Sequence, residues 1–190
     1  MFPNCKNAHL SLRCLCECAI LIGCAQLLGY LKIYEMPAGG SVTVCMLPIM
    51  LICCRWGAGP GLLSGLIFGA LQMLLDGAYS WGWISIILDY LAAFMVLGFA
   101  GIVRKLPYNL VFASIVGCTL RFCSHLLSGY FFVRGESSFT IYSIKTASPW
   151  LYSAIYNGAY MLPNLIILVA VGFALAKPLN KYLYAKDLNV

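Results

Sequence analysis

Long apolar segments separated by short polar connections dominate this chain. Most of them approach the roughly 20 residues that a helix needs to cross a hydrocarbon core of about 30 Å. The segments cover residues 14–33, 42–54, 57–75, 81–103, 108–133 and 150–176. This pattern predicts an all-α integral membrane protein, built as a bundle of six transmembrane helices.

The second segment is short, and Arg55 and Trp56 separate it from the third. Such a helix either thins the bilayer to cross it or enters only part of the membrane, and the sequence leaves both open. The sixth segment contains Pro163, which predicts a kink.

The distribution of basic residues predicts the orientation, because cytoplasmic loops are enriched in Lys and Arg. With six spans, both termini lie on the same side, which we expect to be the cytoplasm. Three basic residues fall on the outer side: Lys32, Arg134 and Lys145. Eight fall on the inner side: Lys6, Arg13, Arg55, Arg104, Lys105, Lys177, Lys181 and Lys186.

Composition agrees with a single membrane domain over residues 1–190, since 62% of the residues are hydrophobic and only 9% are charged. Residues 1–13 are too polar and too short for a cleaved signal peptide, so we expect none. The net charge of +6 is scattered over segment ends, which favours a role in orientation over nucleic-acid binding. The ten cysteines have no histidine at zinc-site spacing and indicate packing rather than a metal centre.

Three polar residues lie inside the predicted spans at one depth: Asp89, His125 and Asn157. Each is about seven residues, or about 10 Å of helix, inside the predicted outer face. Polar groups within spans are costly and usually face a cavity or a partner. Their convergence predicts a binding site for a small polar molecule that opens to the exterior.

Each of these residues also has a structural interpretation. Asp89 needs a partner, which is a cationic ligand, His125 or Arg121. His125 is alternatively a structural histidine, and Asn157 alternatively bonds a neighbouring helix. Arg121 shares a helix face with His125 at i, i+4 spacing.

Tyrosines near this level supply ring faces that suit a delocalised cation, although tyrosine also anchors spans at the interface. The candidates are Tyr79, Tyr90, Tyr152 and Tyr160. An intramembrane protease is excluded because Ser64 lies near the inner face and cannot meet His125. No ATP-binding signature is present, so any pumping would have to be driven by another chain or by an ion gradient.

Several stretches together carry a resemblance to a known family. They are Met36-Pro-Ala-Gly-Gly-Ser-Val-Thr-Val, Met46-Leu-Pro-Ile, Leu88-Asp-Tyr, Arg121 with His125-Leu-Leu-Ser-Gly129, and Leu151-Tyr-Ser-Ala-Ile-Tyr-Asn157-Gly-Ala-Tyr-Met-Leu-Pro163. The chain resembles, from about Arg13 to Lys177, the thiamine-specific substrate-binding component of energy-coupling factor transporters. This resemblance implies a six-helix bundle that binds thiamine near the outer face of a bacterial plasma membrane.

The resemblance also implies roles for individual residues. Its substrate-binding positions match Asp89, Tyr90, His125, Gly129, Tyr152, Asn157 and Tyr79. Ala19 and Gly23 match the small-residue motif on the first helix that contacts a transmembrane coupling subunit. Two ATPase subunits would hydrolyse ATP, and no cofactor is expected in this chain.

Two departures from the family pattern concern tryptophans. Val133 and the Gly39-Gly40 stretch stand where some members have tryptophan, so stacking on the thiazolium would need a tyrosine. Gly39 and Gly40 are expected to make the first outer loop flexible, as in a lid. A related vitamin or a pyrimidine precursor is therefore an alternative ligand. The alternative function is that of a structural membrane protein, in which the polar residues serve only to join helices.

Overall fold

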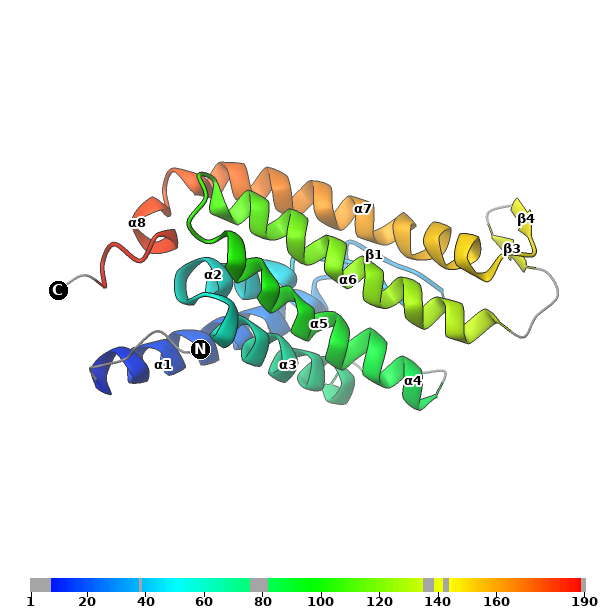
Figure 1. The fold of residues 1–190 in the computed structure, drawn as a ribbon, viewed down its shortest axis with the longest axis horizontal. Coiled ribbons are helices and arrows are strands. Elements are labelled where there is room, and N and C mark those ends of the chain that lie inside the picture. Colours follow the sequence, from blue (N-terminus) through cyan, green and yellow to red (C-terminus); the bar gives the residue numbers. More distant parts are fainter. Residues whose placement is uncertain (1–7, 38, 76–81, 135–138, 142–143, 189–190) are drawn as a thin grey trace.

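The two longest helices, α6 (Asn109–Val133) and α7 (Pro149–Ala176), lie side by side along the bundle (Figure 1). The computed structural model describes residues 8–37, 39–75, 82–134, 139–141 and 144–188. Ser148 caps the start of α7, because its hydroxyl accepts a hydrogen bond from the Leu151 amide, and the helix continues through Pro163. The remaining helices are α1 (Ala8–Tyr30), α2 (Met46–Trp56), α3 (Ala58–Leu75), α4 (Trp83–Ser85), η1 (Ile86–Ala92), α5 (Ala93–Met95), η2 (Val96–Val103) and α8 (Asn180–Leu183).

Five helical stretches in the described residues are long and apolar enough to cross a membrane: Leu12–Tyr30, Ala58–Leu75, Trp83–Val103, Asn109–Val133 and Pro149–Ala176. These lie close to the predicted segments 14–33, 57–75, 81–103, 108–133 and 150–176. The mostly helical membrane fold is therefore confirmed, while the count of six spans stays a prediction.

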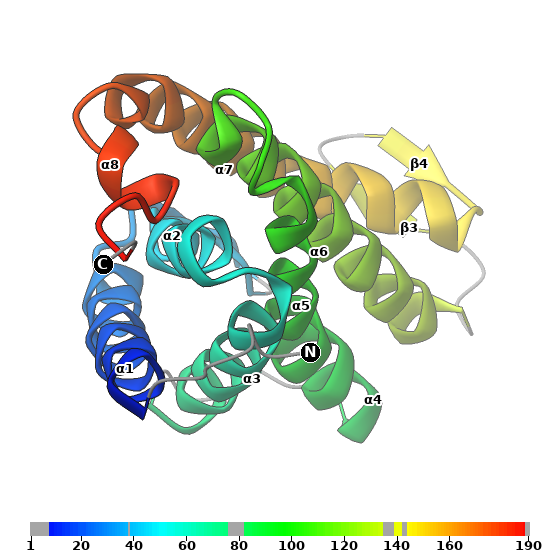
Figure 2. The same ribbon diagram turned by 60° about the vertical axis from the view of Figure 1, so that its left-hand side comes forward.

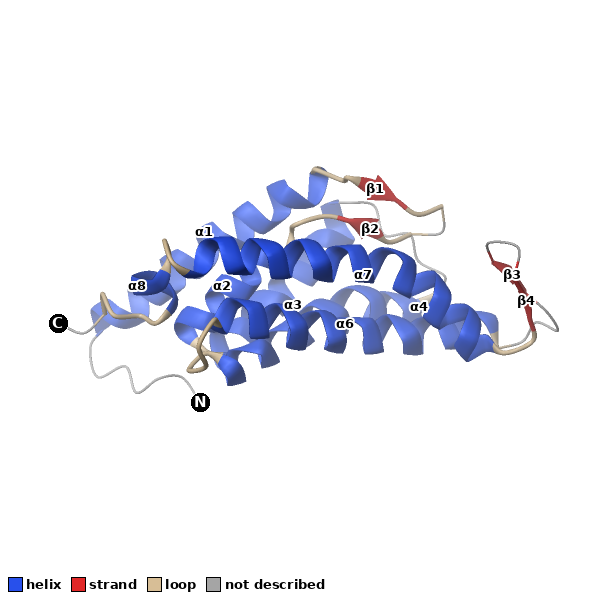
Figure 3. Cartoon of the chain, turned by 90° about the horizontal axis from the view of Figure 1, so that it is seen from above, coloured by secondary structure: helices blue, strands red, loops and turns tan. Residues whose placement is uncertain are grey.

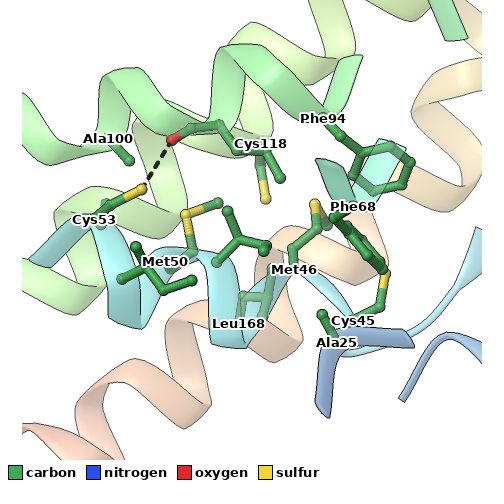
Figure 4. Close-up of a cluster of buried hydrophobic side chains, with 14 of the residues drawn as sticks. Ala25, Cys45, Met46, Met50, Cys53, Phe68, Phe94, Ala100, Cys118 and Leu168 are labelled. Atoms are coloured by element: carbon green, nitrogen blue, oxygen red, sulfur yellow. Dashed lines mark hydrogen bonds between the residues drawn. The ribbon is translucent and has the colours of Figure 1, made fainter. Parts of the chain in front are cut away.

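The short α2 helix has 11 residues, about 16 Å of helix, which is too short to cross a bilayer unaided. It lies in the middle of the bundle, as Figure 2 shows, and packs against α1, α3, η2 and α6. Its apolar side chains form much of the core, where Met46 and Met50 are fully buried beside Phe68 and Leu168 (Figure 4).

The stretch Trp83–Val103 is one continuous helix of uneven winding. It passes from α4 into the π-helical η1 and, after α5, into the 3₁₀-helical η2. Close packing against α3 depends on glycines, because a Cβ at Gly98 would overlap the backbone of Gly61 and Leu62. Small residues thus let α3 and η2 approach closely within this chain.

Two antiparallel hairpins lie toward one end of the bundle (Figure 3). Strands β1 (Tyr34–Glu35) and β2 (Ser41–Val42) connect α1 to α2, and β3 (Phe139–Ile141) and β4 (Ile144–Thr146) connect α6 to α7. The first turns of α1 lie with α8 at the opposite end (Figure 1).

A buried ion network joins the elements at that opposite end. The Arg55 side chain, fully buried, donates to Glu17 on α1 at 2.5 Å and makes a two-point pair with Asp187 at 2.7 and 2.8 Å. Asp187 also accepts from Arg13 at 2.6 Å, and Glu17 accepts from the Trp56 indole at 3.0 Å. Two cations and two anions therefore form one partly exposed network around the buried Arg55 side chain, and this network holds the C-terminal segment against α1 and α2.

Candidate functional site

A cavity of about 200 Å³ opens between η1, α6, α7 and the β1–β2 hairpin. Six of the predicted binding residues line it: Asp89, Tyr90, His125, Gly129, Tyr152 and Asn157. The seventh, Tyr79, lies outside the described residues. Asp89, His125 and Asn157 therefore meet at one cavity, as their common depth in the sequence predicted.

Asp89 lies on η1, where the wider π-helical turn interrupts the regular hydrogen bonding of the span. Such turns occur often at functional sites. Its carboxylate accepts hydrogen bonds from Ser85 at 2.6 Å, Ser128 at 2.5 Å and His125 Nδ1 at 2.8 Å. The side chain keeps 26% of its surface exposed, so the carboxylate also faces the cavity.

His125 lies between Asp89 and Arg121, and its two neighbours fix its tautomer. Arg121 Nε lies 3.1 Å from His125 Nε2, and an arginine can only donate. Nε2 is therefore the acceptor, and Nδ1 carries the proton that is donated to Asp89. The sequence allowed a direct ion pair between Asp89 and Arg121. In the structure His125 lies between them and forms a hydrogen bond with each.

Arg121 lines the same cavity and its guanidinium lies 4.0 Å from the centre of the Phe94 ring. The ring face and His125 together hold the guanidinium at the inner side of the site. One anion and one cation, bridged by a neutral imidazole, leave the polar end of the cavity close to neutral.

Asn157 joins α7 to α6 while facing the cavity. Its Nδ2 donates to the His125 carbonyl at 3.2 Å and to the Ser153 carbonyl at 3.0 Å, and its Oδ1 accepts from Tyr160 at 2.8 Å. The helix-joining alternative for Asn157 is therefore part of its role. At Gly129 a Cβ would overlap the Ser153 hydroxyl, so the close approach of α6 and α7 requires glycine there.

Tyrosines at four-residue spacing on α7 form an aromatic wall. Tyr152 and Tyr156 have nearly parallel rings with centres 6.3 Å apart, and Tyr160 meets Tyr156 edge-on at 6.5 Å. Residues i, i+4 and i+8 share one helix face, which explains why all three line the cavity. Tyr90 lines the cavity from η1.

The β1–β2 hairpin covers part of the cavity and is held by α7. The Tyr156 hydroxyl donates to the Gly39 carbonyl at 2.9 Å, and Asn164 binds both the Ser41 carbonyl and the Thr43 amide. Gly40 has a φ of +94°, and a Cβ there would lie 2.6 Å from the Tyr160 ring. The glycine pair predicted to give the loop flexibility therefore also permits its close contact with the aromatic wall.

Several cavity residues were missed by sequence reasoning. Ser85 precedes Asp89 by four residues and Ser128 follows His125 by three, so both share a helix face with a predicted residue. This spacing was an available signal. Lys32 and Glu35 at the hairpin, which pair at 2.9 Å, gave no such signal because their position depends on how the loop folds back.

Ala19 and Gly23 lie on the exposed face of α1 and do not line this cavity. A Cβ at Gly23 would meet nothing within 4 Å, so the internal packing does not require a glycine there. Among the described residues, no group of three or more His, Cys, Asp or Glu could hold a metal ion.

Comparisons with known proteins agree with this architecture. A solved structure of ThiT from Listeria monocytogenes superposes with a TM-score of 0.77 at 23% identity, covering 91% of this chain and 98% of that one, and this match concerns the fold. The thiamine transporter ThiT of Bacillus subtilis is 35% identical over 172 residues, which span 83% of this chain and 86% of the relative. ThiT of Lacticaseibacillus paracasei is 24% identical over 195 residues, with 94% of each chain covered.

The family model described as thiamine transporter protein (Thia_YuaJ) matches residues 15–183, which include every described residue of the cavity. The family inferred from the sequence is thereby confirmed. The chain belongs to the thiamine transporter family.

Proposed function

We propose that thiamine occupies the cavity between η1, α6, α7 and the β1–β2 hairpin. As a member of its family, the chain is a thiamine-binding transport protein of the plasma membrane, which it crosses several times, and it is not an enzyme. The observation that carries the proposed site is the partly exposed Asp89 carboxylate beside an aromatic wall, since thiamine combines a cationic ring with hydrogen-bonding groups.

The roles of individual residues follow from the chemistry of the two thiamine rings. Asp89, His125, Tyr152 and Asn157 would hydrogen-bond the aminopyrimidine, because carboxylate, imidazole, hydroxyl and amide offer both donors and acceptors. Tyr90 and the Asp89 charge would favour the thiazolium cation, as would the predicted Tyr79. Tyr156 supports the same role from the α7 wall and replaces the missing tryptophans as a stacking surface. Gly129 would contribute by letting α7 pack closely on α6, which brings Asn157 to the ligand.

We further propose that the chain crosses the membrane six times, with both termini in the cytoplasm. The cavity and both hairpins then lie at the outer end, and the Arg55 network lies at the inner end. In this arrangement α2 is one of the six membrane crossings. It is surrounded by longer helices and not by lipid. A reporter fused to the C-terminus, active only in the cytoplasm, tests the orientation.

The proposed assembly is an energy-coupling factor transporter, with this chain as the substrate-binding component beside a transmembrane coupling subunit and two ATPase subunits. Ala19 and Gly23 support this proposal because a small, exposed helix face permits close contact with another helix. No cofactor is proposed for this chain, and ATP would be hydrolysed by the partner subunits.

Thiamine titration of the purified, detergent-solubilised chain tests the site, with tryptophan fluorescence and melting temperature as readouts. Wild type should bind saturably, and Asp89→Asn should weaken binding by about 30-fold or more, because removal of a buried charge partner costs about 2 kcal/mol or more. Unchanged affinity in a folded Asp89→Asn protein would remove Asp89 from the site.

The same assay separates the alternatives. If the hydroxymethyl pyrimidine alone competes as well as thiamine, the ligand is the precursor class. If no vitamin shifts either signal, the polar residues serve only to join helices.

A further inference from the structure

A second cavity of about 360 Å³ lies at the end of the bundle opposite the thiamine site, between the start of α6, the end of α7 and α8. Five polar or aromatic residues line it: Tyr108, Asn109, Lys177, Asn180 and Tyr184. Nothing in the proposed binding of thiamine uses this cavity, which shares no lining residue with the first one.

Asn109, the first residue of α6, is completely buried and has an unused acceptor. Its Nδ2 donates to the Arg104 carbonyl at 3.0 Å and to the Leu183 carbonyl at 3.2 Å, which fixes the orientation of the amide. Its Oδ1 is buried and has no partner within the described residues. An unpaired buried acceptor is unfavourable by about 1–3 kcal/mol, so a hydrogen-bond donor from outside the chain would be stabilised there.

The surroundings of this acceptor are cationic. Lys177 lines the cavity, and the neighbouring segments contribute Arg104, Lys105, Lys181 and Lys186. The segment before α6 and the C-terminal segment are held together, because the Tyr184 hydroxyl donates to the Leu106 carbonyl at 2.8 Å. The described residues between 90 and 186 include no aspartate or glutamate, and Asp187, which follows Lys186, is paired with Arg13 and Arg55. The N-terminal end of the 25-residue α6, which no side chain caps, adds the positive end of a helix dipole.

An apolar face continues from the cavity toward the spans. The rings of Tyr108 and Phe173 lie 5.7 Å apart, and both side chains are more than half exposed. The site thus presents a cation, a hydrogen-bond acceptor and an apolar surface next to one another. A soluble anion would bind the cation and the hydrogen-bond acceptor but would leave the apolar surface uncovered.

We propose that this cavity binds the headgroup of an anionic phospholipid that carries free hydroxyl groups, as in phosphatidylglycerol. Lys177 and the start of α6 attract the phosphate, a headgroup hydroxyl donates to Asn109 Oδ1, and the acyl chains lie along Tyr108 and Phe173. Basic clusters beside membrane spans at the cytoplasmic face are known to favour anionic lipids by about 1 kcal/mol for each Lys or Arg.

Lipid retention by the full-length, detergent-purified chain tests this site, measured by native mass spectrometry with three lipids of equal acyl chains. Phosphatidylglycerol should be retained best, phosphatidylmethanol (the same charge without hydroxyls) less, and phosphatidylcholine least. Equal retention of the first two would overturn the role of Asn109, and equal retention of all three would overturn the site. This comparison leaves Asn109 intact, which matters because its amide also holds two carbonyls.

Two charge variants distinguish the cavity from diffuse attraction. Lys177→Gln should lower phosphatidylglycerol retention by about fivefold, whereas Lys181→Gln, which removes the same charge outside the lining, should lower it by less than about twofold. Equal losses, or no loss in either variant, would overturn the proposal. Thiamine affinity should stay unchanged in both and serves as the measure of folding.

Competition with a water-soluble headgroup compound shows whether the cavity binds a lipid or a free phosphodiester. Glycerophosphoglycerol at millimolar concentration should fail to displace the lipid, since it cannot cover the Tyr108–Phe173 surface. Full displacement would assign the cavity to a free phosphodiester and overturn the lipid assignment.

Discussion

The imidazole Nδ1 of His125 lies 2.8 Å from Asp89 Oδ1, and the two residues come from neighbouring helices of the bundle. Because Arg121 occupies the other imidazole nitrogen, His125 acts as a fixed donor to the carboxylate. The Asp89 carboxylate is therefore oriented before any ligand arrives, with its remaining acceptor capacity directed to the cavity. Preorganisation of this kind reduces the cost of ordering the site on binding.

Two substitutions at His125 separate this orienting role from simple packing. His125→Leu removes the donor and should weaken thiamine binding by about 30-fold. His125→Asn places an amide donor near the position of Nδ1 and should recover a substantial part of the loss. Isothermal titration gives both affinities, and equal losses in the two variants would show that His125 contributes only packing.

The contact between Tyr156 and the β1–β2 hairpin is predicted to slow the dissociation of thiamine. Tyr156→Phe removes the donor to the Gly39 carbonyl and keeps the ring, so thiamine should dissociate about five times faster, as expected for one hydrogen bond of about 1 kcal/mol. Stopped-flow fluorescence measures the rate. Tyr184→Phe is the matched control, because its hydroxyl binds the Leu106 carbonyl at the other end of the bundle and should leave the rate unchanged.

Gly98 is predicted to be intolerant of any side chain. Gly98→Ala would place a methyl group against the backbone of Leu62, where no rotamer can relieve the overlap, and should destabilise the protein by at least about 2 kcal/mol. Gly158→Ala is the control, since a Cβ there meets nothing within 4 Å. Melting temperatures in detergent should therefore fall for the first variant alone, and a tolerated Gly98→Ala would mean that α3 and η2 can separate without cost.

Much of the site was predictable because a membrane makes polar residues conspicuous. Asp89, His125 and Asn157 interrupt apolar spans, and the helix rise together with the predicted orientation of the spans placed them at one depth. The position of the β1–β2 hairpin was not predictable in the same way. Lys32 and Glu35 reach the cavity only because Tyr156 and Asn164, more than 100 residues later, hold the loop.

The role of Arg55 shows a second limit of the sequence. Its position between two apolar segments indicated a cytoplasmic loop residue, yet its side chain is fully buried against Glu17 and Asp187. Periodicity describes which face of a helix is apolar, but it does not reveal an ion pair between residues 132 positions apart. The same limit applies to α2, whose central position depends on contacts with α1, α3, η2, α6 and α8.

The Arg55 network predicts a dependence of stability on pH. The Arg55 guanidinium beside Asp187 holds the pKa of that carboxyl well below its usual range. A lowered folded-state pKa stabilises the fold above the ordinary carboxyl value of about 4, and this contribution is lost as the pH falls through the folded-state pKa. Asp187→Asn should therefore cost about 1–3 kcal/mol at pH 7, with the difference from wild type shrinking below about pH 4.

Thermal unfolding in detergent across this pH range provides the measurement. Glu35→Gln is the control, because its ion pair with Lys32 is largely exposed and should contribute less than about 1 kcal/mol. A constant difference between Asp187→Asn and wild type at every pH would contradict the role of the Asp187 charge.

The exposed face of α1 predicts that assembly and thiamine binding can be separated. Gly23→Leu adds a large side chain at an exposed position where a Cβ meets nothing within 4 Å, so folding and thiamine affinity should be unchanged. Contact with a coupling subunit that packs closely on Ala19 and Gly23 should be lost, because small residues let helices approach. Co-purification of the partner subunits and thiamine uptake in cells measure this, with Ile166→Ala on the exposed face of α7 as the control for a general change of the exposed surface. Uptake at the wild-type level in Gly23→Leu would place the coupling contact on another face of the bundle.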